Sequence, residues 1–78
     1  MEEVRERVVK VVSEVLEVPA AKVTDAGTFT DIEKWDSLFH LNVVLGIEQE
    51  FNLHFDLQEV MLITSVDSTV DLINQKQG

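Results

Sequence analysis

The sequence contains no cysteine, only one proline and only three glycines. Without cysteine the chain has neither a disulfide framework nor a thiolate metal cage, so apolar packing must hold the fold together. The two histidines, at positions 40 and 54, are weak support for a metal site without neighbouring cysteines. We therefore expect no bound metal.

Long hydrophobic runs are also missing. No apolar stretch approaches the roughly 20 residues needed to cross a bilayer. The start, Met1-Glu2-Glu3, is acidic and passes at once into an amphipathic pattern. A signal peptide would begin with basic residues and continue with a solid apolar run. These absences favour a cytoplasmic protein that does not insert into a membrane.

Positive charge is scarce, because 15 acidic side chains stand against 6 basic ones and the formal net charge is −9. From Asp36 to Gln75 the sequence contains acidic residues but neither lysine nor arginine. Such a surface repels nucleic acid and favours partners with basic patches. Composition alone, however, is explained better by an acidic surface that only keeps the protein soluble than by a surface that binds such partners.

The length of 78 residues predicts a single domain, 1–78, with modest stability. Its first helix is predicted over 2–17, where valines recur at helical spacing: Val4, Val8, Val11, Val12 and Val15. Val18-Pro19 ends this helix, because proline disfavours the helical conformation in the residue before it. Residues 19–35 are predicted to form a long ordered loop, and its apolar anchors are Val23, Phe29 and Ile32.

A second helix is predicted over 37–51, with Asp36 as its N-cap. Its apolar residues cover most of the circumference: a stripe of Leu38, Leu41, Val44, Leu45 and Phe51 is widened by Val43 and Ile47. A helix this apolar must be buried on more than one side or line an apolar cavity.

A short third helix is expected over 56–62, with Leu57, Val60 and Met61 facing inward. Thr64-Ser65-Val66-Asp67 resembles a capping box in which Asp replaces the usual Glu. It opens a last helix that carries Val66, Val70 and Ile73. The predicted fold is all-α, a four-helix bundle with a long first loop and a short third helix.

Asp36-Ser37-Leu38 is the most informative motif of the chain. A serine in the first turn of a helix offers its hydroxyl to solvent beside unpaired backbone N–H groups. An anion attached there is stabilised by the positive end of the helix dipole. Ser37 is therefore well placed to carry a phosphodiester.

With these elements in order, the chain resembles an acyl carrier protein over nearly its whole length. The matching elements are Val18 and Phe29 in the loop, Asp36-Ser37-Leu38, Glu48-Gln49-Glu50-Phe51 and Ile63-Thr64-Ser65-Val66. The resemblance implies that a phosphopantetheinyl transferase attaches phosphopantetheine from coenzyme A to Ser37. The thiol of that arm then carries acyl or aminoacyl groups as thioesters.

The resemblance also implies roles for other residues. Asp36 would help to bind the transferase's magnesium, and Leu38 would support docking of that enzyme. Glu48 and Glu50 would meet basic patches on partner ligases, synthases and transferases. Such contacts would be transient and sensitive to salt. The protein itself would be a monomeric carrier rather than an enzyme.

Gly46 stands in mid-helix, where glycine costs up to about 1 kcal/mol relative to alanine. Tight helix packing is one explanation. The other is that the missing side chain leaves room for a bound acyl chain beside Val43 and Ile47.

Three positions depart from carriers that serve fatty acid synthesis. Trp35 replaces a small residue, and Phe39 and Asn42 replace residues that are usually acidic. The departures favour a carrier of a dedicated or secondary pathway, with primary fatty acid synthesis as the alternative. Trp35 itself is either a core anchor or an exposed recognition residue.

Two different classes of function remain in competition with a carrier. One is an acidic helical adaptor that binds a partner helix and is never modified. The other is a hydrolase based on Ser37 and His40, which lie one turn apart on one helix with no residue to orient a base. We expect His40 to be a surface residue beside the arm and His54 to be a solvated loop residue.

Overall fold

The computed structural model describes residues 2–32 and 35–77, with Glu2 and Asp25 described by their backbone only. Within these ranges the chain forms five α-helices, one 3-10 turn and no strand. The elements are α1 (Glu2–Leu16), α2 (Ala20–Asp25), η1 (Phe29–Asp31), α3 (Ser37–Phe51), α4 (Leu57–Leu62) and α5 (Val66–Gln77). The all-helical prediction is confirmed.

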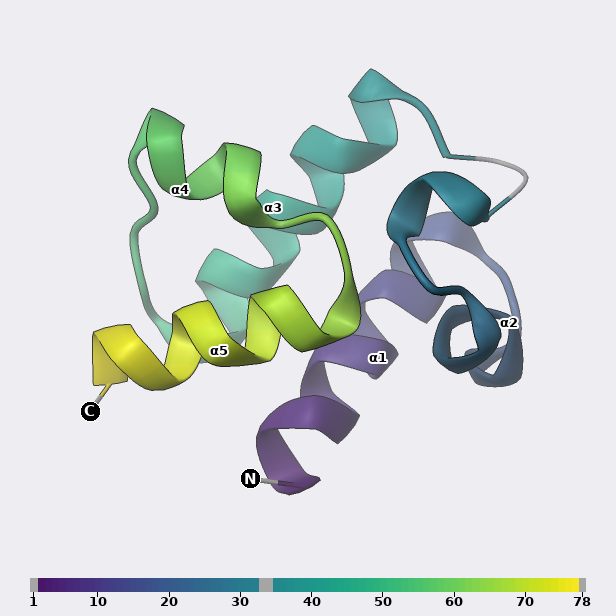
Figure 1. Cartoon of the computed structure of the whole chain (residues 1–78), viewed down its shortest axis with the longest axis horizontal. Coiled ribbons are helices and arrows are strands. Elements are labelled where there is room, and N and C mark those ends of the chain that lie inside the picture. Colours follow the sequence, from purple (N-terminus) through teal and green to yellow (C-terminus); the bar gives the residue numbers. More distant parts are fainter. Residues whose placement is uncertain (1, 33–34, 78) are drawn as a thin grey trace.

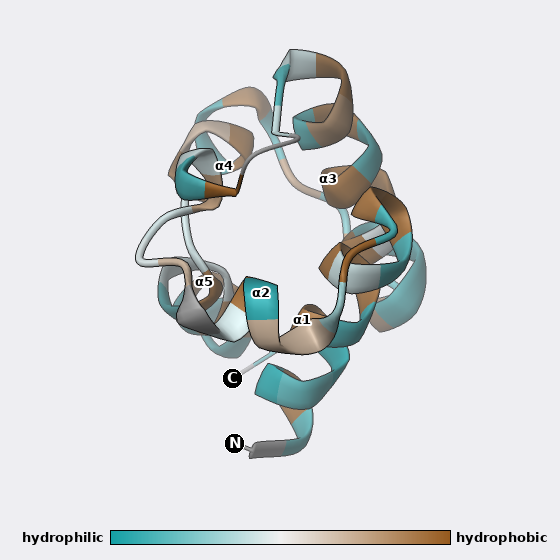
Figure 2. Cartoon of the chain, turned by 90° about the vertical axis from the view of Figure 1, so that its right-hand side faces the viewer, coloured by the Kyte–Doolittle hydropathy of each residue, from teal (hydrophilic) through white to brown (hydrophobic). Residues whose placement is uncertain are grey.

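Helix α1 is the central element, because it packs against α2, α3 and α5, while α4 packs on α5 (Figure 1). The N-terminal end of α1 is mostly hydrophilic, whereas α3 carries long hydrophobic stretches (Figure 2). No helix in the described ranges has both the length and the apolar character that a membrane span requires.

The segment predicted as a loop contains α2 and η1, so the structure has five helices where the sequence predicted four. Pro19 precedes α2 with φ −60° and ψ 147°, and its carbonyl accepts from the Lys22 amide at 2.9 Å. Alanines at positions 20 and 21 have high helix propensity, which explains this added turn. Positions 33–34 of the predicted loop lie outside the described residues.

The predicted anchors of this segment are all buried: Val23, Phe29 and Ile32. The Phe29 amide also donates to the Thr64 carbonyl at 2.8 Å, which joins the segment to the connection between α4 and α5. The segment is therefore attached to the core at several points, as the sequence predicted.

The core is formed by apolar residues from α1, α2, η1, α3 and α5 and from the connecting segments, while Val60 of α4 packs against it from outside. Fully buried members include Val8, Val12, Val43, Ile47, Ile63 and Ile73. Burying a side chain of this size contributes roughly 1.5–3 kcal/mol. Thr69 is buried among them. Its hydroxyl donates to the Ser65 carbonyl at 2.7 Å, so this buried polar group has a hydrogen-bond partner.

The buried side of α3 differs from the predicted stripe. The residues of α3 that are buried are Val43, Val44, Ile47 and Phe51, whereas Leu38, Leu41 and Leu45 are exposed. Because apolar residues surround the helix, periodicity alone does not define which side meets the core. The contacts of α3 with its neighbours select that side.

The prediction for α4 is wrong in the same respect. Leu57 and Met61 were expected to face inward, but both are exposed. Val60 packs against the core, and Glu59 turns toward Lys76 of α5. Leu57 and Met61 are four residues apart and share one face of α4, and that face is turned away from the core.

The start of α5 uses a different partner from the predicted capping box. The Ser65 hydroxyl accepts from the Ser68 amide at 3.0 Å, and the Ser68 hydroxyl accepts from the Ser65 amide at 3.1 Å. The reciprocal bonds thus connect two serines. Asp67 instead forms an ion pair with Arg5 of α1, at 2.6 Å.

Gly46 lies at the contact between α3 and α1. A Cβ atom at this position would lie 2.8 Å from Val11 Cγ1 and 3.7 Å from Val15 Cγ2. Val11 is buried, and its β-branched side chain has little freedom to rotate in a helix. Tight packing therefore explains this glycine.

Arg7 of α1 secures the same contact. Its Nε donates to Glu50 Oε2 at 2.8 Å, and its Nη2 donates to the Glu50 carbonyl at 2.6 Å. The guanidinium also lies 4.2 Å from the centre of the Phe51 ring. One side chain of α1 thus binds the last turn of α3 in three ways.

We predict that Gly46→Ala lowers the free energy of unfolding by about 1 kcal/mol, because overpacking against Val11 outweighs the gain in helix propensity. Urea denaturation measures this change. Val11→Ala removes the Cγ1 atom that a Cβ at position 46 would approach. In that background Gly46→Ala should therefore raise the free energy of unfolding relative to Val11→Ala alone. Additive effects of the two substitutions would contradict the packing explanation.

Glu59 connects α4 to α5. Its carboxylate accepts from the Asp56 amide at 3.0 Å and from Lys76 Nζ at 2.9 Å. The hydrogen bond from the Asp56 amide, followed by the Lys76 ammonium, lowers the pKa of Glu59 below its ordinary 4.5. Lys76 Nζ also lies 5.6 Å from the centre of the Phe55 ring.

This lowered pKa predicts a pH dependence of stability. The stabilisation is fully present above the unfolded-state pKa and is lost as the pH falls through the lower folded-state pKa. Glu59→Gln keeps an acceptor for the Asp56 amide but removes the charge. The difference in unfolding free energy between wild type and Glu59→Gln should be constant near neutral pH and shrink below pH 4.5. Denaturant titrations at several pH values test this; a constant difference throughout would contradict it.

Candidate functional site

Ser37 is the first residue of α3, and it is exposed. Asp36 precedes it in extended conformation, with φ −149° and ψ −177°, and its Oδ1 accepts from the Phe39 amide at 2.9 Å. The prediction that Asp36 is the N-cap of a helix over 37–51 is confirmed. The cap fixes where the helix begins and so places the Ser37 hydroxyl in the first turn.

The position of Ser37 favours an attached anion. Helix α3 is 15 residues long, and the backbone N–H groups of its first turn point toward its N-terminal end. A negative charge at this end is stabilised by roughly 0.3–1 kcal/mol. The first turn itself contains no acidic residue, and the Asp36 cap takes up the Phe39 amide.

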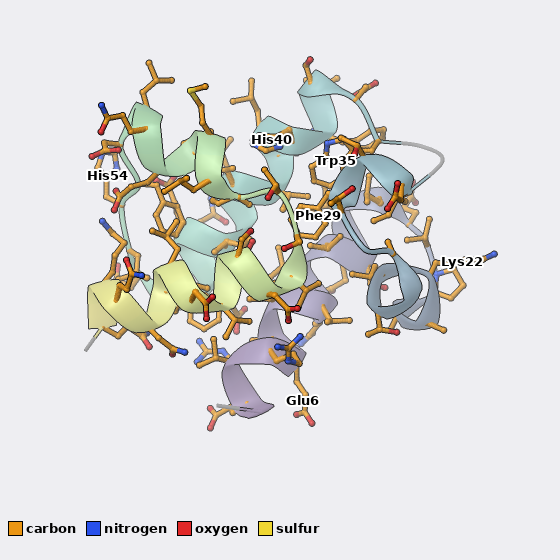
Figure 3. The ribbon with its side chains drawn as sticks, in the orientation of Figure 1. Glu6, Lys22, Phe29, Trp35, His40 and His54 are labelled. Carbon is orange, nitrogen blue, oxygen red and sulfur yellow. The ribbon has the colours of Figure 1, made fainter. Side chains whose placement is uncertain are left out.

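Trp35 forms an aromatic wall beside the serine. Its ring stacks on the ring of Phe29, with the two centroids 4.8 Å apart. It also packs edge-to-face against the imidazole of His40, with the centroids 5.5 Å apart. Figure 3 shows the three rings together below the start of α3. Trp35 is half-buried and packs against the core, as the interpretation of a core anchor expected.

A surface depression begins beside Ser37 and extends along the aromatic wall. It combines apolar side chains with hydroxyl, carboxylate and imidazole groups. Its lining residues are Thr30, Trp35, Asp36, Ser37, His40 and Leu41. These residues come from η1, from the two residues directly before α3 and from the first turns of α3, so the depression depends on the position of η1 beside the start of α3.

His40 differs from the expected surface residue. It is half-buried, and its Nε2 lies 3.0 Å from the Val60 carbonyl oxygen. Because a carbonyl oxygen only accepts hydrogen bonds, Nε2 carries the proton and donates it. That nitrogen therefore joins α3 to α4 and does not serve Ser37 as a general base. His54, by contrast, is 92% exposed, as predicted.

The two glutamates predicted to meet partners have partners within the chain. Glu48 is 18% exposed, and its Oε2 accepts from the Phe55 amide at 2.8 Å. Glu50 is bound by Arg7, 43 residues away in the sequence. Sequence reasoning missed both contacts, because they depend on how the helices meet. Docking of basic surfaces at these two carboxylates stays a prediction.

The residues of the candidate acyl-chain pocket are part of the packed core. Val43 and Ile47 are fully buried, and Gly46 lies against Val11. An acyl chain could enter here only by displacing packed side chains. Leu38, the other predicted recognition residue, is 64% exposed next to Ser37.

A scan of the chain against models of protein families gave no match. In the described ranges, no group of three or more histidine, cysteine, aspartate or glutamate side chains is arranged to hold a metal ion.

We predict that Asp36→Ala lowers the free energy of unfolding by about 1 kcal/mol, because the Phe39 amide loses its acceptor. Asp36→Asn should be nearly neutral, since an asparagine oxygen caps a helix about as well. Urea denaturation of both variants tests the assignment. Equal losses for the two would show that the carboxylate acts through its charge and not as a cap.

Proposed function

We propose that the protein is an acyl carrier, which receives a phosphopantetheine arm on Ser37 and presents acyl or aminoacyl thioesters to partner enzymes in the cytoplasm. The observation that carries the proposal is the exposed Ser37 hydroxyl at the first residue of α3, directly after the Asp36 cap. The order of α1, α3, α4 and α5 supports it, because these helices occupy the spans expected from the resemblance.

The attachment step is a phosphoryl-type transfer from coenzyme A. The Ser37 oxygen forms a new bond to the phosphorus that bears pantetheine, the P–O–P linkage of coenzyme A breaks, and adenosine 3′,5′-bisphosphate leaves. In this proposal the hydroxyl proton passes to a base on the transferase; His40 Nε2 does not take it, since that nitrogen donates to the Val60 carbonyl. When attached, the arm supplies a thiol that holds the cargo as a thioester.

The surroundings of Ser37 fit such a group. The start of α3 stabilises the negative charge of the new phosphodiester. The depression lined by Trp35, His40 and Leu41 provides surface for the first atoms of the arm. In this proposal the protein is not itself an enzyme, since the chemistry belongs to the transferase and to the partners that load and unload the thiol.

Incubation with coenzyme A and a broad-specificity phosphopantetheinyl transferase tests the proposal. Intact-mass measurement should show the gain of one arm on wild type and no gain on Ser37→Ala. Asp36→Asn should keep the fold and be modified more slowly, if Asp36 also helps to bind the transferase's magnesium. An unmodified wild type, or a modified Ser37→Ala variant, would refute the assignment.

Within this proposal we favour a dedicated or secondary pathway over primary fatty acid synthesis. Trp35 and Phe39 are half-buried beside the site, and Asn42 is exposed and uncharged. The start of α3 therefore offers partners little of the acidic surface that fatty-acid carriers present. The partners would be acyl or aminoacyl ligases, synthases and transferases.

An unmodified helical adaptor is the second candidate, and one observation favours it. Helices α3 and α4 expose several large apolar side chains, which a partner helix could cover. The same mass measurement distinguishes the two functions, because an adaptor stays unmodified with every transferase and in every host.

A further inference from the structure

Six large apolar side chains on α3 and α4 are more exposed than buried, and one of them, Leu62, lies at the junction with α5. Leu38, Leu41 and Leu45 follow one another at helical spacing on α3, with exposed fractions of 64%, 55% and 53%. On α4, Leu57 and Met61 are 78% and 70% exposed. We call these five residues the α3–α4 face. An exposed apolar cluster of this kind is typical of an interaction site.

The two helices that carry these residues are joined by one hydrogen bond. The hydrogen bond between His40 Nε2 and the Val60 carbonyl joins α3 to α4, which lie near each other in Figure 1. The opposite flank of α3 is covered by α1, through Gly46 and Glu50. Leu41 and Leu45 are four residues apart, so they lie one turn from each other on the exposed side of α3.

The α3–α4 face carries no charge, although the chain has a net charge of −9. Other exposed residues of α3 and α4 close to it in sequence are also uncharged: Asn42, Gln49 and Gln58. The nearest carboxylates stand directly before the first residue of each helix or are mostly buried. Asp36 and Asp56 accept from backbone amides as N-caps, and Glu48 accepts from the Phe55 amide.

The face also continues to the modification site. Leu38 follows Ser37 directly, and Leu41 lines the depression beside the Ser37 hydroxyl. An enzyme that reaches the serine or its arm must cover this part of α3. A basic patch on that enzyme would meet no free carboxylate at the centre of the face, whereas apolar side chains would meet leucines.

We infer that the enzymes acting at Ser37 dock on the α3–α4 face by apolar contact, using a surface of apolar side chains that lacks a cluster of lysine and arginine. The inference rests on the proposed function and specifies its partner. A second copy of the chain fits the face less well, because two molecules of charge −9 repel each other. Binding by apolar contact depends little on salt, unlike binding by exposed charges.

The experiment measures the initial rate of Ser37 modification as a function of carrier concentration, at saturating coenzyme A. We expect Leu41→Gln and Leu45→Gln together to raise the apparent KM about fivefold or more, because each removes apolar contact from the centre of the interface. Leu57→Gln with Met61→Gln should act in the same direction. The KM of wild type should change by less than about twofold between 50 mM and 500 mM NaCl.

Leu62→Gln is the matched control. Leu62 is 58% exposed on the same short helix, but it lines a depression between α4 and α5 together with Ser68 and Asp71. This variant should be modified like wild type. Circular dichroism of every variant checks that the helices are intact.

Three results would overturn the inference. Normal KM values for all face variants would show that the enzyme docks elsewhere, and a KM that rises steeply with salt would show that charge governs docking. Sedimentation equilibrium that finds a dimer of wild type, dissociated by the face substitutions, would assign the face to self-association. Failure of wild type to gain the arm at all is a separate result, which refutes the proposed function as well.

Discussion

Gly46 allows the backbone of α3 to lie directly against Val11 of α1, and this contact fixes the rotation of α3 about its own axis. Arg7 then reaches both the carboxylate and the carbonyl of Glu50 from α1. With this rotation set, Val43 and Ile47 point into the core. Leu38, Leu41 and Leu45 are left outside, on the surface that adjoins Ser37. The buried core and the exposed face are thus two consequences of one close approach.

The parts of the fold that depend on local sequence were predictable. The bounds of α1 and α3, the Asp36 cap and the three anchors of the segment 19–35 follow from spacing and capping chemistry within a few residues. The added helix α2 was missed because its six residues show no apolar periodicity beyond Val23. The rotation of α3 was missed for a different reason, since an apolar pattern around most of a helix is compatible with several orientations.

The candidate site also has one part that local sequence predicts and another part that it does not. Ser37 and Asp36 were identified because cap and serine are adjacent in the chain. The depression beside them is lined by residues of η1 and of the start of α3. The hydrogen bond between His40 and Val60 joins residues that are 20 positions apart in the sequence. Neither the depression nor this hydrogen bond is indicated by residues that are close together in the sequence. The pairing of Glu50 with Arg7 likewise turns a residue that looks like a free surface charge into a structural one.

Trp35 gives the site an optical property. The chain has one tryptophan and no tyrosine, so its intrinsic emission comes from a single indole. That indole is stacked on Phe29, contacts the imidazole of His40 and lines the same depression as the Ser37 hydroxyl. The native protein therefore contains a fluorophore at the base of the site, and events at the serine can be followed in real time without any introduced label.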